Sequence, residues 1–169
     1  MKPHVMLQKL MWAAFTLIVL CVVMRLVIIR GSCKWYHEQQ KVLLCGMHAL
    51  NNALQERLVT CNDLRRINEE QELNVGFADG MEQNFRAEVL HAWLQRHVPA
   101  ASVRWGGDTG NLQVRVWAIV GDGGHYKAYR RCNVDGEWYN LDSLLEKPQK
   151  VSHDMLLEAL RRALVVFYL

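Results

Sequence analysis

Cys45 is followed by Gly46 at the start of a predicted helix that runs from Leu44 to Leu54. Apolar residues recur in this segment at the three- to four-residue spacing of a helix. A thiolate is the working nucleophile of a cysteine, and both a helix N-terminus and a neighbouring histidine favour its formation. Cys45 meets the first condition, so the chemistry requires a histidine supplied from elsewhere in the chain.

His125 is the predicted general base. It follows Asp122-Gly123-Gly124 at the start of a predicted strand over residues 126–131. A turn through residues 133–136 would place this strand beside the next one, over residues 137–141, after which Asp142 follows. A carboxylate there could hold the imidazole by its second ring nitrogen. Asn140 lies two residues earlier on the same face of the strand, and it remains an alternative orienting residue.

Other polar residues near Cys45 have simpler interpretations. His48 lies one turn along the same helix, where it cannot easily face both the thiol and a substrate, so we expect a satisfied core histidine. Asn51 and Asn52 are expected to hydrogen-bond the helix to a loop and not to catalyse. The histidines without a comparable context are His37, His91, His97 and His153.

These motifs resemble those of a known family. Residues 45–55 read CGMHALNNALQ, which is similar to the C-x-x-H-x-L-N-N-x-L-Q signature of the Josephin family of deubiquitinating cysteine proteases. Upstream, residues 36–40 read YHEQQ, similar to the family's F/Y-H-E-x-Q. Downstream, His125-Tyr126 and the WYNLDSLL of residues 138–145 match its histidine and Asn/Asp blocks, and residues 84–95 match its middle helix more weakly.

The resemblance implies roles for four residues: Cys45 as nucleophile, His125 as base, Asp142 as the orienting acid and Gln40 as an oxyanion-hole donor. The substrate would be ubiquitin, cleaved after its C-terminal glycine, with no cofactor and no metal. The alternatives are a Josephin-like module that only binds ubiquitin and a papain-like protease that acts on another modifier or on peptides. A long helical hairpin usual in the family has only residues 71–83 available here, so that arm should be short or absent.

The predicted elements that position these residues give an α+β, papain-like fold, with a helical half followed by an antiparallel sheet. Thr60 with Asp63 resembles a capping box for a helix that ends near Glu70. A helix opening at Asn84 ends before Pro99. Strand-like segments follow at residues 102–105, 112–120, 126–131 and 137–141. Ser152 can cap a last helix over residues 152–163, and residues 164–169 are predicted to form a closing strand.

The N-terminus is a predicted membrane anchor. From Leu10 to Ile29 the chain has 20 positions with one charge, Arg25, and a helix of this length spans roughly 30 Å, the thickness of a hydrocarbon core. We therefore expect a short tail at 1–9, a transmembrane helix at 10–30 and a catalytic domain at 31–169. A cleaved signal peptide, a buried helix and a later start codon are the alternatives.

Charge and cysteine content limit the possible partners and the cellular compartment of the protein. The residues after the predicted anchor carry 16 basic and 17 acidic side chains, so no basic surface points to nucleic acid. Five cysteines without a C-x-x-C pair indicate neither a disulfide framework nor a zinc site, and reduced thiols are expected. Basic residues are in slight excess after the apolar run, which favours a single-pass membrane protein with its catalytic domain in the cytosol.

Overall fold

The computed structural model describes residues 16–18, 20, 33–40, 44–71, 85–107 and 112–169. The chain divides into two units, Met1–Lys34 and Trp35–Leu169. The predicted anchor at 10–30 lies outside the described residues except for helical positions 16–18 and 20. Among the residues that are described, none of the helices has the length and apolar character needed to cross a membrane.

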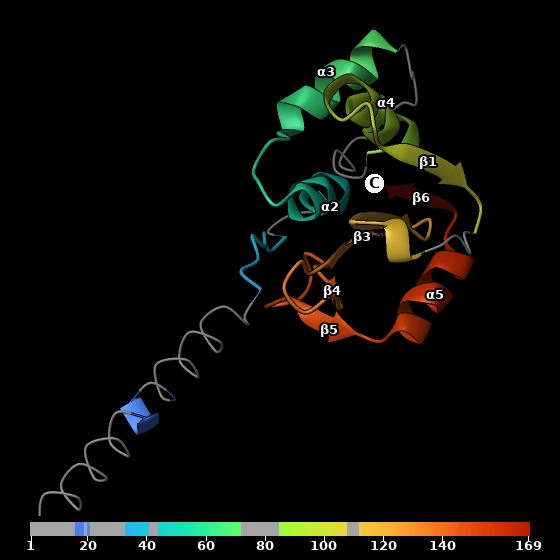
Figure 1. Ribbon diagram of the computed structural model, residues 1–169. Coiled ribbons are helices and arrows are strands. Elements are labelled where there is room, and N and C mark those ends of the chain that lie inside the picture. The colour runs from blue at the N-terminus through green and yellow to red at the C-terminus, as the bar shows by residue number, and fades with distance from the viewer. Residues whose placement is uncertain (1–15, 19, 21–32, 41–43, 72–84, 108–111) are drawn as a thin grey trace, which may run out of the picture. The chain divides into compact units, whose positions relative to one another are not determined.

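The second unit contains four helices within its described residues, labelled as in Figure 1. They are α2 (Cys45–Leu54), α3 (Cys61–Glu70), α4 (Ala87–His97) and α5 (His153–Arg162). Two begin at the caps that the sequence predicts: Thr60 and Asp63 form a reciprocal capping box, and the Ser152 side chain accepts the N–H of Met155. α4 begins at Ala87, later than predicted, and has no side-chain cap.

In the part of the chain that the structure describes, six strands form one antiparallel sheet in the order β1-β6-β2-β3-β4-β5. Their bounds are β1 (Ser102–Trp105), β2 (Trp117–Gly121), β3 (Tyr126–Arg131), β4 (Trp138–Asn140), β5 (Gln149–Val151) and β6 (Val165–Tyr168). The predicted strand at 112–120 is wrong in its first half, because Leu112–Val114 is a 3-10 turn. β5 is not predicted by the sequence.

Helices cover both faces of the sheet (Figure 1). Strand residues alternate between two hydrophobic clusters: Ile119 and Phe167 pack with α2, α3 and α4, whereas Val120 and Val166 pack with Leu156 of α5. This double cover explains why every residue of β2 is buried. The predicted α+β class with an antiparallel sheet is confirmed, and the sheet becomes the rigid base for α2.

Candidate active site

Cys45 is the first residue of α2 and is only 2% exposed. Its helix packs against β3, so the thiol lies near the strand that His125 precedes. Gly46 permits this close packing, because a Cβ at that position would lie 3.1 Å from Leu90 of α4 and 3.4 Å from the ring of Tyr126. A larger residue beside Cys45 would require the Leu90 side chain to give way by a few tenths of an ångström.

His125 closes the tight turn between β2 and β3. The Asp122 carboxylate accepts the backbone N–H of His125 at 2.9 Å and that of Gly124 at 3.2 Å. The Asp122 N–H in turn donates to the His125 carbonyl at 3.2 Å. Gly123 takes a φ of +91°, which a residue with a Cβ rarely adopts. The Asp-Gly-Gly-His sequence thus fixes the backbone of the predicted base.

Asp142 reaches His125 from the end of the neighbouring strand. β3 and β4 pair antiparallel with Tyr129 opposite Asn140, so the start of β3 and the residues after β4 lie at the same end of the sheet. Asp142 Oδ1 lies 2.7 Å from His125 Nε2. Asn140 instead accepts the backbone N–H of Asp142 at 3.0 Å, so it supports the carboxylate and does not contact the imidazole through a hydrogen bond among the described residues.

The three side chains form one hydrogen-bonded chain. Hydrogen bonds to Asp142 and then to Cys45 raise the pKa of His125 from 6.5 to about 9, against the opposing effect of burial. Because Nε2 faces Asp142, Nδ1 is the nitrogen left for the thiol. Burial alone would raise the pKa of Asp142, but hydrogen bonds from His125 and from the Leu144 N–H hold it below its ordinary value.

Ser143, the residue after Asp142, holds Gln40 close to these three side chains. The Gln40 N–H donates to the Ser143 carbonyl at 2.8 Å, and the Ser143 hydroxyl donates to Gln40 Oε1 at 3.1 Å. With its oxygen engaged in this way, the Gln40 side chain can present its amide N–H groups to another acceptor. Residues 41–43, which link Gln40 to α2, lie outside the described residues.

His48 has a different partner. Its Nδ1 lies 2.8 Å from Oε2 of Glu38, and that carboxylate also accepts from Tyr36 and from Asn51 at 3.0 Å. The burial of Glu38 would raise its pKa, but these hydrogen bonds together lower it. His48 therefore belongs to a structural network on the side of α2, in agreement with its interpretation as a satisfied histidine.

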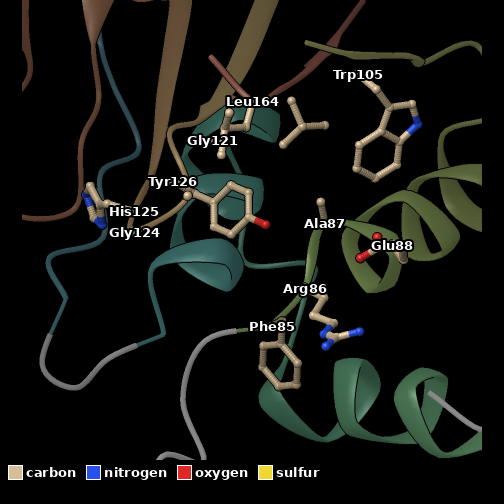
Figure 2. Close-up of a pocket in the computed structure, with 12 residues that line it drawn as sticks. Phe85, Arg86, Ala87, Glu88, Trp105, Gly121, Gly124, His125, Tyr126 and Leu164 are labelled. Atoms are coloured by element: carbon tan, nitrogen blue, oxygen red, sulfur yellow. The ribbon is translucent and has the colours of Figure 1, made fainter. Parts of the chain in front are cut away.

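A cavity of about 360 Å³ opens beside His125. Figure 2 shows the Tyr126 side chain pointing into it, with its hydroxyl towards Ala87, while His125 lies at its edge. Three of its lining residues are glycines, and the others lie at or next to the start of α4, the end of β1, the start of β3 and the start of β6. The lining residues are Phe85, Arg86, Ala87, Glu88, Trp105, Gly121, Gly123, Gly124, His125, Tyr126, Leu164 and Val165.

Two contributors to the site escape sequence reasoning. Ser143 holds Gln40 from 103 positions away, and the Tyr126 side chain points into the cavity beside His125. Burial first, and then the charges of Cys45 and Glu88, raise the pKa of Tyr126 well above its ordinary value. Ser143 lies inside the WYNLDSLL block and Tyr126 follows the predicted base, but neither has a local signal of its own role.

The cysteines differ in part from the prediction. Cys45 and Cys61 are free thiols, whereas Cys33 and Cys132 are each disulfide-bonded, so the expectation of reduced thiols is wrong for these two residues. Neither disulfide-bonded cysteine takes part in the hydrogen-bonded chain described above, in which the thiol is that of Cys45. Cys61 is half-buried at the start of α3 and offers a natural control thiol.

A buried cysteine at a helix N-terminus, a histidine hydrogen-bonded to it and an acid behind that histidine define the constellation of a cysteine hydrolase. Comparison with known proteins agrees with this class. The Josephin family model matches residues 40–166, and this chain belongs to the Josephin family, a family of deubiquitinating cysteine proteases. The chain is 29% identical over 141 residues to mouse Josephin-2 and 28% identical over 141 residues to human Josephin-2. Each alignment covers 70% of this chain and 73% of the relative.

Proposed function

We propose that this chain is a thiol-dependent deubiquitinase with a papain-like arrangement of its catalytic groups, hydrolysing isopeptide or peptide bonds at the C-terminus of ubiquitin. The observation that carries the proposal is the hydrogen bonding of His125 to both Cys45 and Asp142, in a chain that belongs to the Josephin family. An imidazole placed in this way can take the thiol proton and later return it to a leaving group.

The proposed reaction has two steps. The Cys45 thiolate attacks the carbonyl carbon of the ubiquitin C-terminal glycine, and the charge on the carbonyl oxygen is stabilised by the Gln40 amide and the Cys45 backbone N–H. His125 then gives its proton to the departing amine, which leaves ubiquitin as a thioester on Cys45. Water, deprotonated by His125, hydrolyses the thioester and regenerates the thiol, with Asp142 holding the imidazole throughout.

The cavity beside His125 supports a narrow peptide substrate. Gly121, Gly123 and Gly124 line the cavity without side chains of their own. Ubiquitin ends in glycine, so its tail would bring no bulk of its own to the position next to the reacting carbonyl. Glu88 and Arg86 at the opposite wall give the cavity polar groups that could bind the tail further from the scissile bond.

The test of this function uses the full chain and ubiquitin carrying an electrophile at its C-terminus. We expect a covalent adduct on Cys45, located by mass spectrometry, with Cys61 unmodified. Release of a fluorogenic amine from the ubiquitin C-terminus should accompany it. Adduct formation without any turnover would identify a binding module, and preference for a different modifier over ubiquitin would replace the substrate while keeping the chemistry.

We also propose that residues 10–30 anchor the chain in a membrane as a single pass, with the catalytic domain in the cytosol. The support is the 20-position apolar run, in which Leu17, Ile18 and Leu20 are helical and 61–64% exposed. The excess of basic residues after the run supports a cytosolic catalytic domain. The disulfide at Cys132 opposes this orientation, because a reducing compartment such as the cytosol disfavours disulfides. Carbonate extraction tests the anchor, and protease protection of the domain in sealed vesicles tests the side.

A further inference from the structure

Asn52 lies on the same face of α2 as the nucleophile. It follows Cys45 by seven residues, which is two helical turns, or roughly 10 Å along the axis. Its side chain is fully buried, with no exposed surface. A buried amide must have its donors and acceptor satisfied, so its partners show which parts of the fold depend on it.

The Asn52 side chain hydrogen-bonds two segments that are distant in sequence. Its Oδ1 accepts the backbone N–H of Glu38 at 2.6 Å, and its Nδ2 donates to the Glu38 carbonyl at 3.2 Å. The same Nδ2 donates to the Leu141 carbonyl at 2.9 Å. Glu38 stands two residues before Gln40, and Leu141 stands immediately before Asp142. The Asn52 side chain, on the helix that carries Cys45, therefore binds the backbone close to Gln40 and next to Asp142.

The two segments are also joined to each other just beyond Asn52. The Gln40 N–H donates to the Ser143 carbonyl at 2.8 Å, and His37 Nε2 lies 2.9 Å from the Leu145 carbonyl. One turn further along α2, the Gln55 side chain exchanges two hydrogen bonds with the backbone of Tyr36, at 3.0 and 3.1 Å. Asn52 is the member of this set whose side chain contacts both segments, and it does so from the helix that carries Cys45.

The neighbouring Asn51 is equally buried but has different partners. Its Oδ1 accepts the N–H groups of Leu58 and Val59, and its Nδ2 donates to the Val59 carbonyl at 3.1 Å and to the Glu38 carboxylate at 3.0 Å. These contacts fasten the loop after α2 and leave the backbone of the site segments alone. The two adjacent asparagines thus form a matched pair, of equal burial and chemistry but with different attachments.

We infer that Asn52 is a positioning residue for the proposed hydrolysis: it sets the distances among Cys45, Asp142 and Gln40 by bonding the backbone next to two of them from the helix of the third. This inference rests on the proposed function. Loss of its amide releases the Glu38 and Leu141 carbonyls together, so the acid and the oxyanion donor lose the side chain that attaches both of their segments to α2. A misplacement of about 1 Å in a catalytic group can cost about 100-fold in rate.

The test compares Asn52→Ala and Asn52→Asp with Asn51→Ala in the full chain. Asn52→Asp keeps the shape and the acceptor for the Glu38 N–H but, when ionised, loses both donated bonds. Both Asn52 variants should lower kcat on a ubiquitin C-terminal amide by at least about tenfold per titrated active site, with KM little changed. Asn51→Ala should lose thermal stability yet keep its kcat per titrated site.

A second readout does not require turnover. The imidazole of His125, followed by NMR against pH, should titrate near pH 9 in the wild type and lower in both Asn52 variants, because Asp142 is no longer held against it. It should be unmoved in Asn51→Ala. If the wild type fails to cleave ubiquitin substrates, the proposed function fails, while this titration still tests the role of Asn52.

Three results would overturn the inference. The first is a wild-type kcat and an unmoved His125 titration in folded Asn52 variants. The second is an equal loss of kcat in Asn51→Ala, which would make the effect a general consequence of destabilising α2. The third is unfolding of both Asn52 variants under conditions where Asn51→Ala folds, because Asn52 would then be a stability element and not a positioning one.

Discussion

Asp142 Oδ1 lies 2.7 Å from His125 Nε2, and the same oxygen accepts the backbone N–H of Leu144 at 3.0 Å. The hydrogen bond from Leu144 therefore orients the Asp142 carboxylate within its own turn, independently of the imidazole. The pKa values of the two groups shift in opposite directions as a result, upward for His125 and downward for Asp142. The predictions below depend on this pair and on the thiol that faces it.

Replacement of Cys45 by Ala should abolish hydrolysis, because no other thiol faces His125 in the described part of the chain. The rate should fall by about 10⁴-fold or more, as when a member of a catalytic triad is removed. The free energy of unfolding should fall by only about 1 kcal/mol, since removal of one sulfur atom leaves only a small void. The measurement is turnover of a ubiquitin C-terminal amide together with thermal unfolding.

The matched control is Cys61→Ala, which removes the other free thiol of the described residues and should leave turnover intact. An inactive Cys61→Ala beside an active Cys45→Ala would assign the nucleophile to α3.

The alkaline limit of activity should follow His125. Its pKa of about 9 means that the imidazole is protonated below this pH and can supply the proton that the leaving amine needs. We expect kcat/KM to fall as pH rises through about 9. A profile that stays flat well above pH 9, measured on a substrate with an amine leaving group, would show that another group supplies the proton.

Substitutions at Asp142 should separate charge from hydrogen bonding. Asp142→Asn keeps an acceptor for the imidazole but loses the charge, so the pKa of His125 should fall and the alkaline limit should move to lower pH. Asp142→Ala also loses the acceptor and should be clearly less active. Serine triads lose about 10⁴-fold on the Asp-to-Asn change, and we expect a smaller loss here because thiolate and imidazolium can rest as an ion pair.

Asn140→Ala is the matched control for that series. It removes only the acceptor of the Asp142 N–H, so the expected effect is a mild loss that does not move the pH limit. A crippled Asn140→Ala beside an active Asp142→Ala would identify Asn140 as the orienting residue.

The same pair should make stability depend on pH. The pKa of His125 is raised on folding from 6.5 to about 9, so the folded state binds the proton more tightly. The resulting stabilisation is complete below about pH 6.5 and is lost as pH rises through about 9. The Tm of the wild type, compared with that of His125→Gln across this range, measures it. A difference between the two that does not change with pH would exclude the linkage.

Local signals in the sequence determined several elements in advance. Thr60 with Asp63 and Ser152 are caps that act within one turn, so the starts of α3 and α5 could be predicted from adjacent residues. The spacing of apolar residues predicted α2, and glycine-bounded segments predicted β1 and β3. The motif around Cys45 and the blocks around His125 and Asp142 identified the family, because they preserve residue types in order along the chain.

Other features required the tertiary structure, because their stabilising partners are remote in sequence. β5 has three residues and is held by pairing with β4, while β6, last in the chain, lies between β1 and β2. The choice of Asp142 over Asn140 depends on how the turn after β4 directs each side chain, which strand alternation does not specify. Asn52 looked the same as Asn51 in sequence. Only folding brings Glu38 and Leu141 to one of these amides and the loop at Val59 to the other, because the hydrogen bonds of a buried side chain depend on which backbone packs against it.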